Sequence, residues 1–399
     1  MPAITVSETR KIIDDFAREI EQRKTSSAKP SKTVINFRNE FVDKHERDIV
    51  KVPIDLLRFR KDNGRIASDV LDYENTNGPL NESEKDTQIL LRGFLEKKDP
   101  EKTDILIKNI LHSGQRQPAI ITCDGFLIDG NRRKMVLEHL IDEYQDDEKF
   151  RFMNVVILPS NEDEGGAPTL LEIEKLENRY QLQSEGKSEY YGFDRALSIR
   201  RKIEIGLELK DQISDDPQYA NATKGQIEKA IKDIHKDYLS PLRCIDRYLK
   251  QFKRDKQYHT VSSGIGDREG RWQAFVDYSN TYSTKFLSER YRLENNVAEE
   301  EIGEIEEAAF DIIRLRNVPD MQKVHQIMRD LHKYCGNRDS KKELLNIPKK
   351  ISPTLSIEEQ FEDAKKRKPL SREAVDAKWE AKNKEQITFH LKRAQKYWA

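Results

Sequence analysis

The sequence has almost no net charge. Its 399 residues contain 71 Lys and Arg against 72 Asp and Glu, so the formal net charge is −1. Nucleic-acid binding therefore cannot be inferred from overall charge and would require a local basic surface, balanced by acidic segments elsewhere. Charged residues still make up 36% of the chain, which is typical of a surface-rich and mainly helical protein.

Cysteines are few, and long apolar runs are absent. Cys123, Cys244 and Cys335 are too far apart for a zinc motif and form no disulfide framework, which fits a reducing cytosol. No apolar stretch reaches the length of a membrane span, and the first residues lack the apolar core of a signal peptide. We therefore expect a cytoplasmic protein with no membrane partner.

The most informative stretch is 118–140, which reads as strand, tight turn, strand, sharp turn and helix. Residues 118–123 are apolar and rich in β-branched side chains, and Asp124-Gly125 is a hairpin turn signal. A second short strand at 126–128 leads into Asp129-Gly130-Asn131. Apolar residues then recur at helical spacing, which predicts a helix.

Three basic residues, Arg132, Arg133 and Lys134, lie in the first turn of that predicted helix. A helix N-terminus is already partly positive, so cations there are unfavourable unless an anion lies among them. Free backbone N–H groups at the same place make phosphate a suitable anion. The alternative is that these side chains simply extend into solvent from an ordinary turn.

The same residues carry a family resemblance. Gln117-Pro118 followed by a hairpin and the turn Gly130-Asn131-Arg132-Arg133 resembles the central motif of the ParB/sulfiredoxin superfamily. The resemblance implies that Gln117, Gly130, Asn131, Arg132 and Arg133 bind the triphosphate of a nucleotide, CTP or ATP. Asn131 departs from the family, because partition ParB proteins have Glu there and sulfiredoxins have the catalytic Cys. Sulfiredoxin chemistry is therefore not expected.

A second part of the resemblance lies in the predicted helix 169–183. Glu177-Asn178 matches the beginning of the E-N-x-x-R motif of partition ParB proteins, with Gln181 in place of the Arg. The match implies that Glu177 binds Mg²⁺ and is the catalytic residue of any slow hydrolysis. It also implies that Asn178 binds phosphate.

Two helices joined by a turn are predicted within 223–254. Ser240-Pro241 has the pattern of an N-cap followed by proline at the first helical position. The second helix carries several basic residues. A basic second helix is typical of a helix-turn-helix, and the ParB resemblance places one here. An ordinary pair of packed helices is the alternative. The predicted DNA-binding residues are Arg243, Arg247, Lys250, Lys253 and Arg254.

The predicted fold class is α+β, with a small mixed-sheet ParB/sulfiredoxin-like domain followed by a helix-turn-helix and helical C-terminal domains. The expected divisions are an N-terminal helix and linker at 1–48, the nucleotide-binding domain at 49–185, the DNA-binding domain at 186–257 and the C-terminal helices at 271–399. The resemblance implies a homodimer, nucleoid-associated in a prokaryote, whose binding to DNA or to itself is gated by a nucleoside triphosphate with Mg²⁺. A ParB-superfamily enzyme (an NTPase or a nuclease) and a DNA-binding module without nucleotide remain alternatives.

Overall fold

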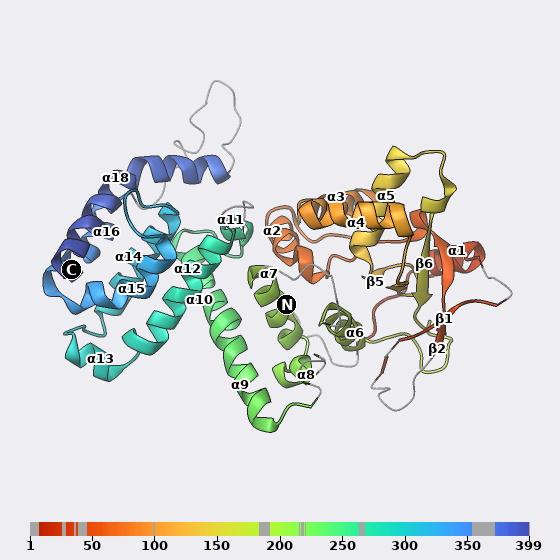
Figure 1. Cartoon of the computed structure of the whole chain (residues 1–399), viewed down its shortest axis with the longest axis horizontal. Coiled ribbons are helices and arrows are strands. Elements are labelled where there is room, and N and C mark those ends of the chain that lie inside the picture. The colour runs from red at the N-terminus through yellow and green to blue at the C-terminus, as the bar shows by residue number, and fades with distance from the viewer. Residues whose placement is uncertain are drawn as a thin grey trace, which may run out of the picture. The chain divides into compact units, whose positions relative to one another are not determined.

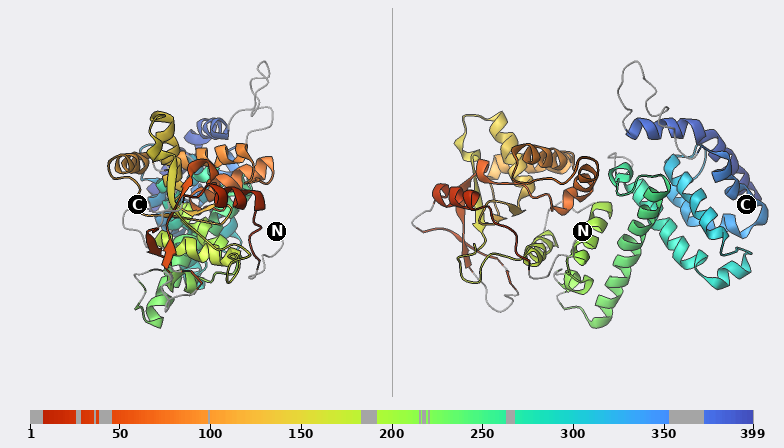
Figure 2. Two further views of the ribbon diagram at one scale, coloured as in Figure 1. Left: turned by 90° about the vertical axis from the view of Figure 1, so that its right-hand side faces the viewer. Right: turned by 180° about the vertical axis from the view of Figure 1, so that it is seen from behind.

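The computed structural model divides the chain into two compact units (Figures 1 and 2). The first contains Met1–Tyr190 and Leu197–Ile231, and the second contains Tyr191–Ala196 and Lys232–Ala399. The structure describes residues 8–25, 29–35, 37–38, 46–98, 100–182, 192–214, 216, 219, 221–262, 268–352 and 372–398.

A mixed four-stranded sheet forms the centre of the first unit. Its strands are β3 (Val50–Pro53), β4 (Ala119–Ile121), β5 (Leu127–Asp129) and β6 (Phe152–Ile157), in the order β3-β6-β4-β5. The pairs β3–β6 and β4–β5 are antiparallel, whereas β4 and β6 are parallel. The coarse α+β prediction is thereby confirmed, and so is the strand, turn, strand and helix order predicted for 118–140.

The helices of the first unit pack on both faces of this sheet. Ala119 and Ile121 of β4 belong to one apolar cluster, while Ile120 between them belongs to the other. This alternation follows from the two-residue period of a strand. The first cluster includes residues of α3, α4 and α5, and the second includes residues of α6. The helices are α1 (Asp14–Arg23), α2 (Ala67–Asn77), α3 (Lys85–Glu96), α4 (Pro100–Ser113), α5 (Asn131–Glu143), α6 (Leu170–Leu182), α7 (Gly192–Glu204), α8 (Leu209–Ser214) and α9 (Lys224–Ile234); α7 and α9 each contain residues of both units.

A separate two-stranded antiparallel sheet pairs β1 (Lys32–Val34) with β2 (Glu46–Asp48). The N-terminal helix α1 begins at Asp14. Ile20 of this helix is buried in the first apolar cluster, which supports packing of α1 on the main body of the unit.

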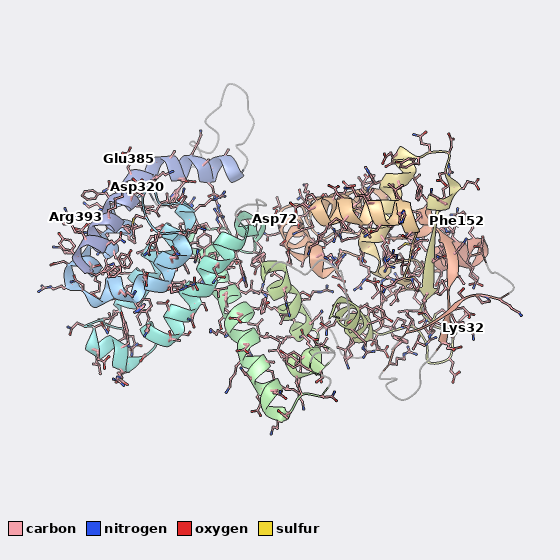
Figure 3. The ribbon with its side chains drawn as sticks, in the orientation of Figure 1. Lys32, Asp72, Phe152, Asp320, Glu385 and Arg393 are labelled. Atoms are coloured by element: carbon pink, nitrogen blue, oxygen red, sulfur yellow. The ribbon has the colours of Figure 1, made fainter. Side chains whose placement is uncertain are left out.

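In its described residues, the second unit is helical. Its helices include those predicted near 299–314, 321–334 and 372–397, whereas the predicted loop at 258–270 contains a short helix. Arg393 of the last helix, labelled in Figure 3, forms an ion pair at 2.9 Å with Glu343 of α16. The helices are α10 (Ser240–Gln251), α11 (His259–Ser262), α12 (Arg268–Thr281), α13 (Glu289–Glu294), α14 (Glu301–Leu315), α15 (Val324–Gly336), α16 (Arg338–Lys350) and α18 (Arg372–Trp398).

The predicted turn between two helices, with the second helix beginning at Ser240-Pro241, is wrong. Residues 224–251 are helical throughout, because a π-helical turn at His235–Leu239 joins α9 directly to α10. Leu239 and Ser240 both have right-handed helical dihedral angles. A proline inside a regular α-helix clashes with the preceding turn, but the wider π-turn relieves this conflict just before Pro241. The described helix therefore contains no helix-turn-helix at this place.

Candidate phosphate-binding pocket

The turn between β5 and α5 has a backbone that only glycine adopts readily. Gly130 has φ 105° and ψ 7°. A Cβ atom at Gly130 would lie 2.6 Å from Ala119 Cβ and 3.0 Å from Met153 Cε. Because glycine has no side chain, its N-cap position supplies no oxygen to the first amides of α5. Those N–H groups are therefore available to an anion at the end of the helix.

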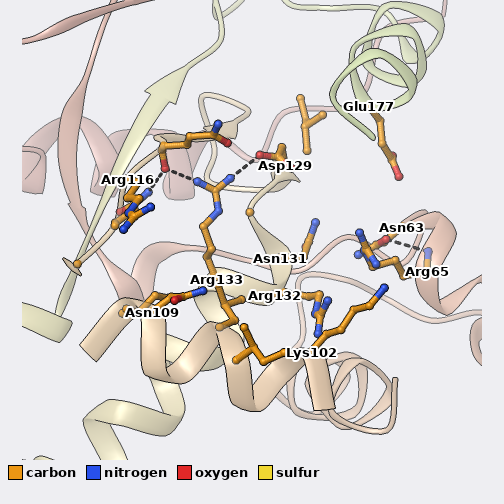
Figure 4. A pocket seen from close by; sticks show the side chains of 18 residues that line it. Asn63, Arg65, Lys102, Asn109, Arg116, Asp129, Asn131, Arg132, Arg133 and Glu177 are labelled. Carbon is orange, nitrogen blue, oxygen red and sulfur yellow. Dashed lines mark hydrogen bonds and ion pairs between the residues drawn. The ribbon is translucent and has the colours of Figure 1, made fainter. Parts of the chain in front are cut away.

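A pocket of about 310 Å³ opens at this turn (Figure 4). Its wall contains five cationic side chains and two carboxylates, which leave a net charge of +3. The cations come from four segments of the chain, and Figure 4 shows Lys102 and Arg132 next to each other, while Glu177 extends toward the pocket from α6. The charged lining residues are Arg65, Lys102, Arg116, Asp129, Arg132, Arg133 and Glu177.

Arg133 lines the pocket and also makes hydrogen bonds that stabilise the fold. Its guanidinium donates one hydrogen bond to the carbonyl oxygen of Gln117 and another to the carboxylate of Asp129. Gln117, where the chain enters β4, lines the pocket as well and also accepts a hydrogen bond through its carbonyl from Gln115 Nε2 at 2.8 Å. Arg133 therefore joins the entry of β4 to the end of β5, and Asp129 offsets part of its charge.

Arg132 has a different neighbourhood. Its Nη2 atom donates to Thr103 Oγ1 of α4 at 3.0 Å. This bond orients the guanidinium along the wall that also contains Lys102 (Figure 4). Within the described chain, no carboxylate forms an ion pair with Lys102, so its charge is not offset at short range.

Asn131 supplies an amide group with unused hydrogen-bonding capacity. The residue is only 8% exposed and lines the pocket. Its Oδ1 atom is buried and has no hydrogen-bond partner among the described residues. A buried polar atom without a partner costs free energy, which a ligand can recover. Rotation of the amide by 180° exchanges its oxygen for its NH₂ group, so either end can meet a ligand.

Glu177 reaches the pocket from α6 but is held by other groups. Its carboxylate lies 3.3 Å from Arg60 Nη1 and accepts a hydrogen bond from the Gly64 amide at 3.3 Å. Burial alone would lower the pKa of Arg60, but the carboxylates of Glu177 and Glu174 raise it above its ordinary value. Arg60 is therefore charged, and it fixes the position of the predicted metal ligand.

The network around Glu177 continues to α7. Arg60 also forms an ion pair with Glu174 at 3.2 Å, and Glu174 lies 3.3 Å from Arg201. Arg201 in turn lies 2.9 Å from Asp62. Burial raises the pKa of Glu174, although Arg201 and Arg60 oppose that shift. These charges connect the rim of the pocket with α7 through groups that are mostly buried.

Asn178 lies away from the pocket. It is 6% exposed, donates to the carbonyl oxygen of Gln212 at 3.2 Å and accepts from Lys202 Nζ at 2.9 Å. It thereby ties α6 to α7 and α8. The structure thus brings together Gln117, Gly130, Asn131, Arg132, Arg133 and Glu177, but it does not bring Asn178 to the same place.

The predicted DNA-binding residues divide into two groups. Arg247 forms two hydrogen bonds of 2.8 Å with Glu306, and Arg254 forms an ion pair of 2.8 Å with Asp376. Hydrogen bonding by Glu306 raises the pKa of Arg247 above its ordinary value. These two arginines are thus bound within the fold, whereas Arg243, Lys250 and Lys253 are exposed.

Three cations of the pocket, Arg65, Lys102 and Arg116, were not among the site residues predicted from the sequence. Arg116 precedes the Gln117-Pro118 pair and was a detectable candidate by position. Lys102 had no such signal, because a lysine near the start of a helix has the pattern of an ordinary solvated side chain. Among the described residues, no cluster of three His, Cys, Asp or Glu side chains forms a metal site, and no helix is long and apolar enough to cross a membrane.

Comparisons with known proteins identified no relative. No family model matches the chain, and neither a curated protein nor a solved structure matches it.

Proposed function

We propose that this chain is a ParB-like nucleotide-binding protein whose pocket at the start of α5 binds the triphosphate of CTP or ATP. The observation that carries the proposal is the gathering of five cations around the uncapped N-terminus of α5. Lysine and arginine donate charge-assisted hydrogen bonds to phosphate oxygens, and the helix amides add further donors. The pocket's apolar side chains, Ile105, Leu106 and Ile110, offer a surface for the remainder of the nucleotide.

Mg²⁺ fits this arrangement as a partner of the phosphates. Magnesium in nucleotide sites is held by one or two carboxylates, by water and by phosphate oxygens. Glu177 is the carboxylate that would hold it, and the ion would supply charge neutralisation between Glu177 and the phosphates. Without such an ion, Glu177 and a triphosphate would repel each other.

The buried ion pairs provide a mechanism by which bound nucleotide would control DNA association or self-association. A ligand that draws Glu177 toward Mg²⁺ weakens its ion pair with Arg60. Arg60 then depends on Glu174, which also binds Arg201 of α7. Nucleotide binding therefore favours a different arrangement of α6 and α7. That rearrangement would control whether the protein forms a homodimer or binds DNA.

DNA association would involve a different surface from the nucleotide pocket. The local basis for it is the exposed group Arg243, Lys250 and Lys253 on and just after α10. The absence of a turn at Ser240-Pro241 removes the argument from a helix-turn-helix.

A thermal-shift screen with CTP, ATP, GTP and UTP, each with and without Mg²⁺, tests the proposal. A ligand that binds only the folded state raises its melting temperature. Arg132→Ala and Lys102→Ala should each reduce nucleotide affinity about ten- to a hundred-fold, because each removes a charge-assisted bond worth about 1.5–3 kcal/mol. Lys108→Ala is the matched control, since Lys108 is exposed on the same helix as Lys102 and does not line the pocket. Equal affinity in all three variants would contradict the proposal.

A further inference from the structure

A second polar pocket lies wholly within the helical unit. It has a volume of about 270 Å³ and is lined by residues from two helices. We call it the π-turn pocket, because a π-helical turn lies at each side: His235–Leu239 on the first helix and Tyr282–Phe286 at the end of α12. Its lining residues are Lys232, His235, Lys236, Ser240, Ser279, Asn280 and Ser283.

The first π-turn explains why these residues share one face. Eight residues of regular α-helix rotate about 80° beyond two full turns, at about 100° per residue. Lys232 and Ser240 are eight residues apart and would therefore diverge on a regular helix. The π-turn absorbs about one extra residue, which brings the two positions nearly into line. π-turns are rare and occur frequently at functional sites, so two of them beside one pocket point to a functional site.

Every side chain that lines the π-turn pocket can donate a hydrogen bond. The lining includes two ammonium groups, one imidazole, three hydroxyls and one carboxamide, and none of the seven residues is acidic. Lys232, His235 and Lys236 are exposed at the opening, whereas Ser279 is only 4% exposed and lies deeper. No described carboxylate forms an ion pair with Lys232 or Lys236.

We propose that the π-turn pocket binds the terminal phosphate of a small phosphorylated ligand. A terminal phosphate has three free oxygens that accept several hydrogen bonds, and lysine is a common phosphate ligand. The phosphate of a nucleic-acid backbone is a weaker candidate. It has two free oxygens, is flanked by sugars and lies on a convex surface, so it does not enter a pocket between two helices. This proposal is independent of the nucleotide site, because no residue is shared between the two pockets.

Lysine-resolved labelling with pyridoxal 5′-phosphate tests the proposal on the full chain. This probe has a phosphate and an aldehyde, which forms an imine with a neighbouring lysine that borohydride then reduces. Mass spectrometry after digestion should find Lys232 or Lys236 labelled, and pyrophosphate should protect that lysine several-fold. Lys229 is the internal control, since it is exposed on the same helix but does not line the pocket. Equal labelling of Lys229 and of the pocket lysines, unaffected by pyrophosphate, would overturn the proposal.

Two further experiments distinguish a small phosphorylated ligand from DNA, and the π-turn pocket from the nucleotide site. A blunt DNA duplex with 5′-hydroxyl ends should give no protection; protection by the duplex but not by pyrophosphate would overturn the small-ligand assignment. Calorimetry with pyrophosphate in an Arg132→Ala, Lys102→Ala background separates the π-turn pocket from the nucleotide site, because each substitution should weaken the nucleotide site about ten- to a hundred-fold. Binding there should be lost in Lys232→Ala or Lys236→Ala and retained in Lys229→Ala. These lysines are exposed, so the variants should fold, and binding that persists in both pocket variants would refute the assignment.

Discussion

Glu177 Oε2 lies 3.3 Å from Nη1 of Arg60, so the proposed Mg²⁺ ligand is already paired with a buried cation. Both side chains are about 4% exposed. A carboxylate held in this way is poorly placed to act as a general base, because both of its oxygens already accept hydrogen bonds, from Arg60 Nη1 and from the Gly64 amide. Asn131 cannot act as a base either. We therefore expect the protein to bind nucleotide and to hydrolyse it only slowly.

Turnover should be well below the ~1–100 s⁻¹ of kinases. Glu177→Gln should abolish what turnover remains and should remove the Mg²⁺ dependence of binding, while binding itself survives. Phosphate release with and without DNA measures the first effect, and calorimetry with and without Mg²⁺ measures the second. Glu164→Gln, in an exposed loop, is the control. Fast release that persists in Glu177→Gln would locate the catalytic residues elsewhere and favour the enzyme alternative.

The two arginines of the turn should differ when each is replaced by alanine. Arg132→Ala should weaken nucleotide binding and lower the melting temperature of the free protein less than Arg133→Ala does, because Arg132 donates to the neutral hydroxyl of Thr103 and Arg133 pairs with a carboxylate. Arg133→Ala should lower both, because it breaks the hydrogen bonds to Gln117 and Asp129. Hydrogen bonds to charged groups are worth about 1.5–3 kcal/mol each, so the free energy of unfolding should fall by an amount of this order. Urea unfolding of both variants without ligand measures the difference, and equal stabilities would contradict the structural role of Arg133.

Gly130→Ala should destabilise the first unit. The positive φ and the 2.6 Å approach to Ala119 Cβ together should cost at least about 1–3 kcal/mol. Gly225→Ala is the matched control, because a Cβ atom there meets nothing within 4 Å and the residue lies in α9. Its stability should be unchanged or raised by up to ~1 kcal/mol. Chemical denaturation of both variants tests the contrast.

The stability of the helical unit should depend on the protonation of Asp311. This residue is 4% exposed, and burial raises the pKa of its carboxyl from an ordinary 3.8 to about 8, although Arg314 opposes the shift. At pH values below the ordinary pKa, both the folded and the unfolded chain hold the proton. Between that value and about 8, the unfolded chain releases a proton that the folded chain keeps. The free energy of unfolding should therefore fall as pH rises through this window, by up to about 1.4 kcal/mol per pH unit.

Asp311→Asn should flatten this dependence, so that the variant gains stability relative to the parent as the pH approaches 8. Asp320→Asn provides the control, since Asp320 is exposed in the same unit (Figure 3). Melting temperatures at a series of pH values measure both variants. Parallel pH profiles for the parent and Asp311→Asn would refute the prediction.

DNA binding should depend on the exposed basic residues on and just after α10. Replacing Arg243, Lys250 and Lys253 with Glu should weaken duplex binding and reduce the slope of affinity against salt by about one per lost phosphate contact. Arg247→Glu should instead destabilise the fold, because Glu306 loses its cationic partner and gains a like charge beside it. Reversal of Lys342, Lys349 and Lys350 on α16 is a charge-matched control. Fluorescence anisotropy at several salt concentrations measures these effects, and identical slopes for the two triple variants would exclude this surface.

The order of elements around the pocket could be predicted from sequence because its determinants are local. Asp124-Gly125 and Gly130 specify turns by their own backbone preferences, and apolar spacing after Asn131 specifies a helix. The cationic turn of α5 was visible for the same reason. The helix start predicted at Ser240-Pro241 rested on an equally local pattern, yet tertiary packing favours a continuous helix there. Leu242, Ile245 and Leu249 are buried in α10, and packing keeps the helix continuous through a π-turn.

The composition of the pocket was decided by the tertiary structure. Lys102 and Arg116 reach it from α4 and from the segment before β4. Arg116 could be suspected only from its position before Gln117-Pro118, and nothing in the sequence around Lys102 marks it as ligand-binding. Adjacent residues 177 and 178 of α6 have different surroundings, since about 100° separates their directions on a helix. Glu177 therefore faces the pocket and Asn178 faces α7 and α8. Local preferences determine which elements form, but only packing determines which of their side chains meet.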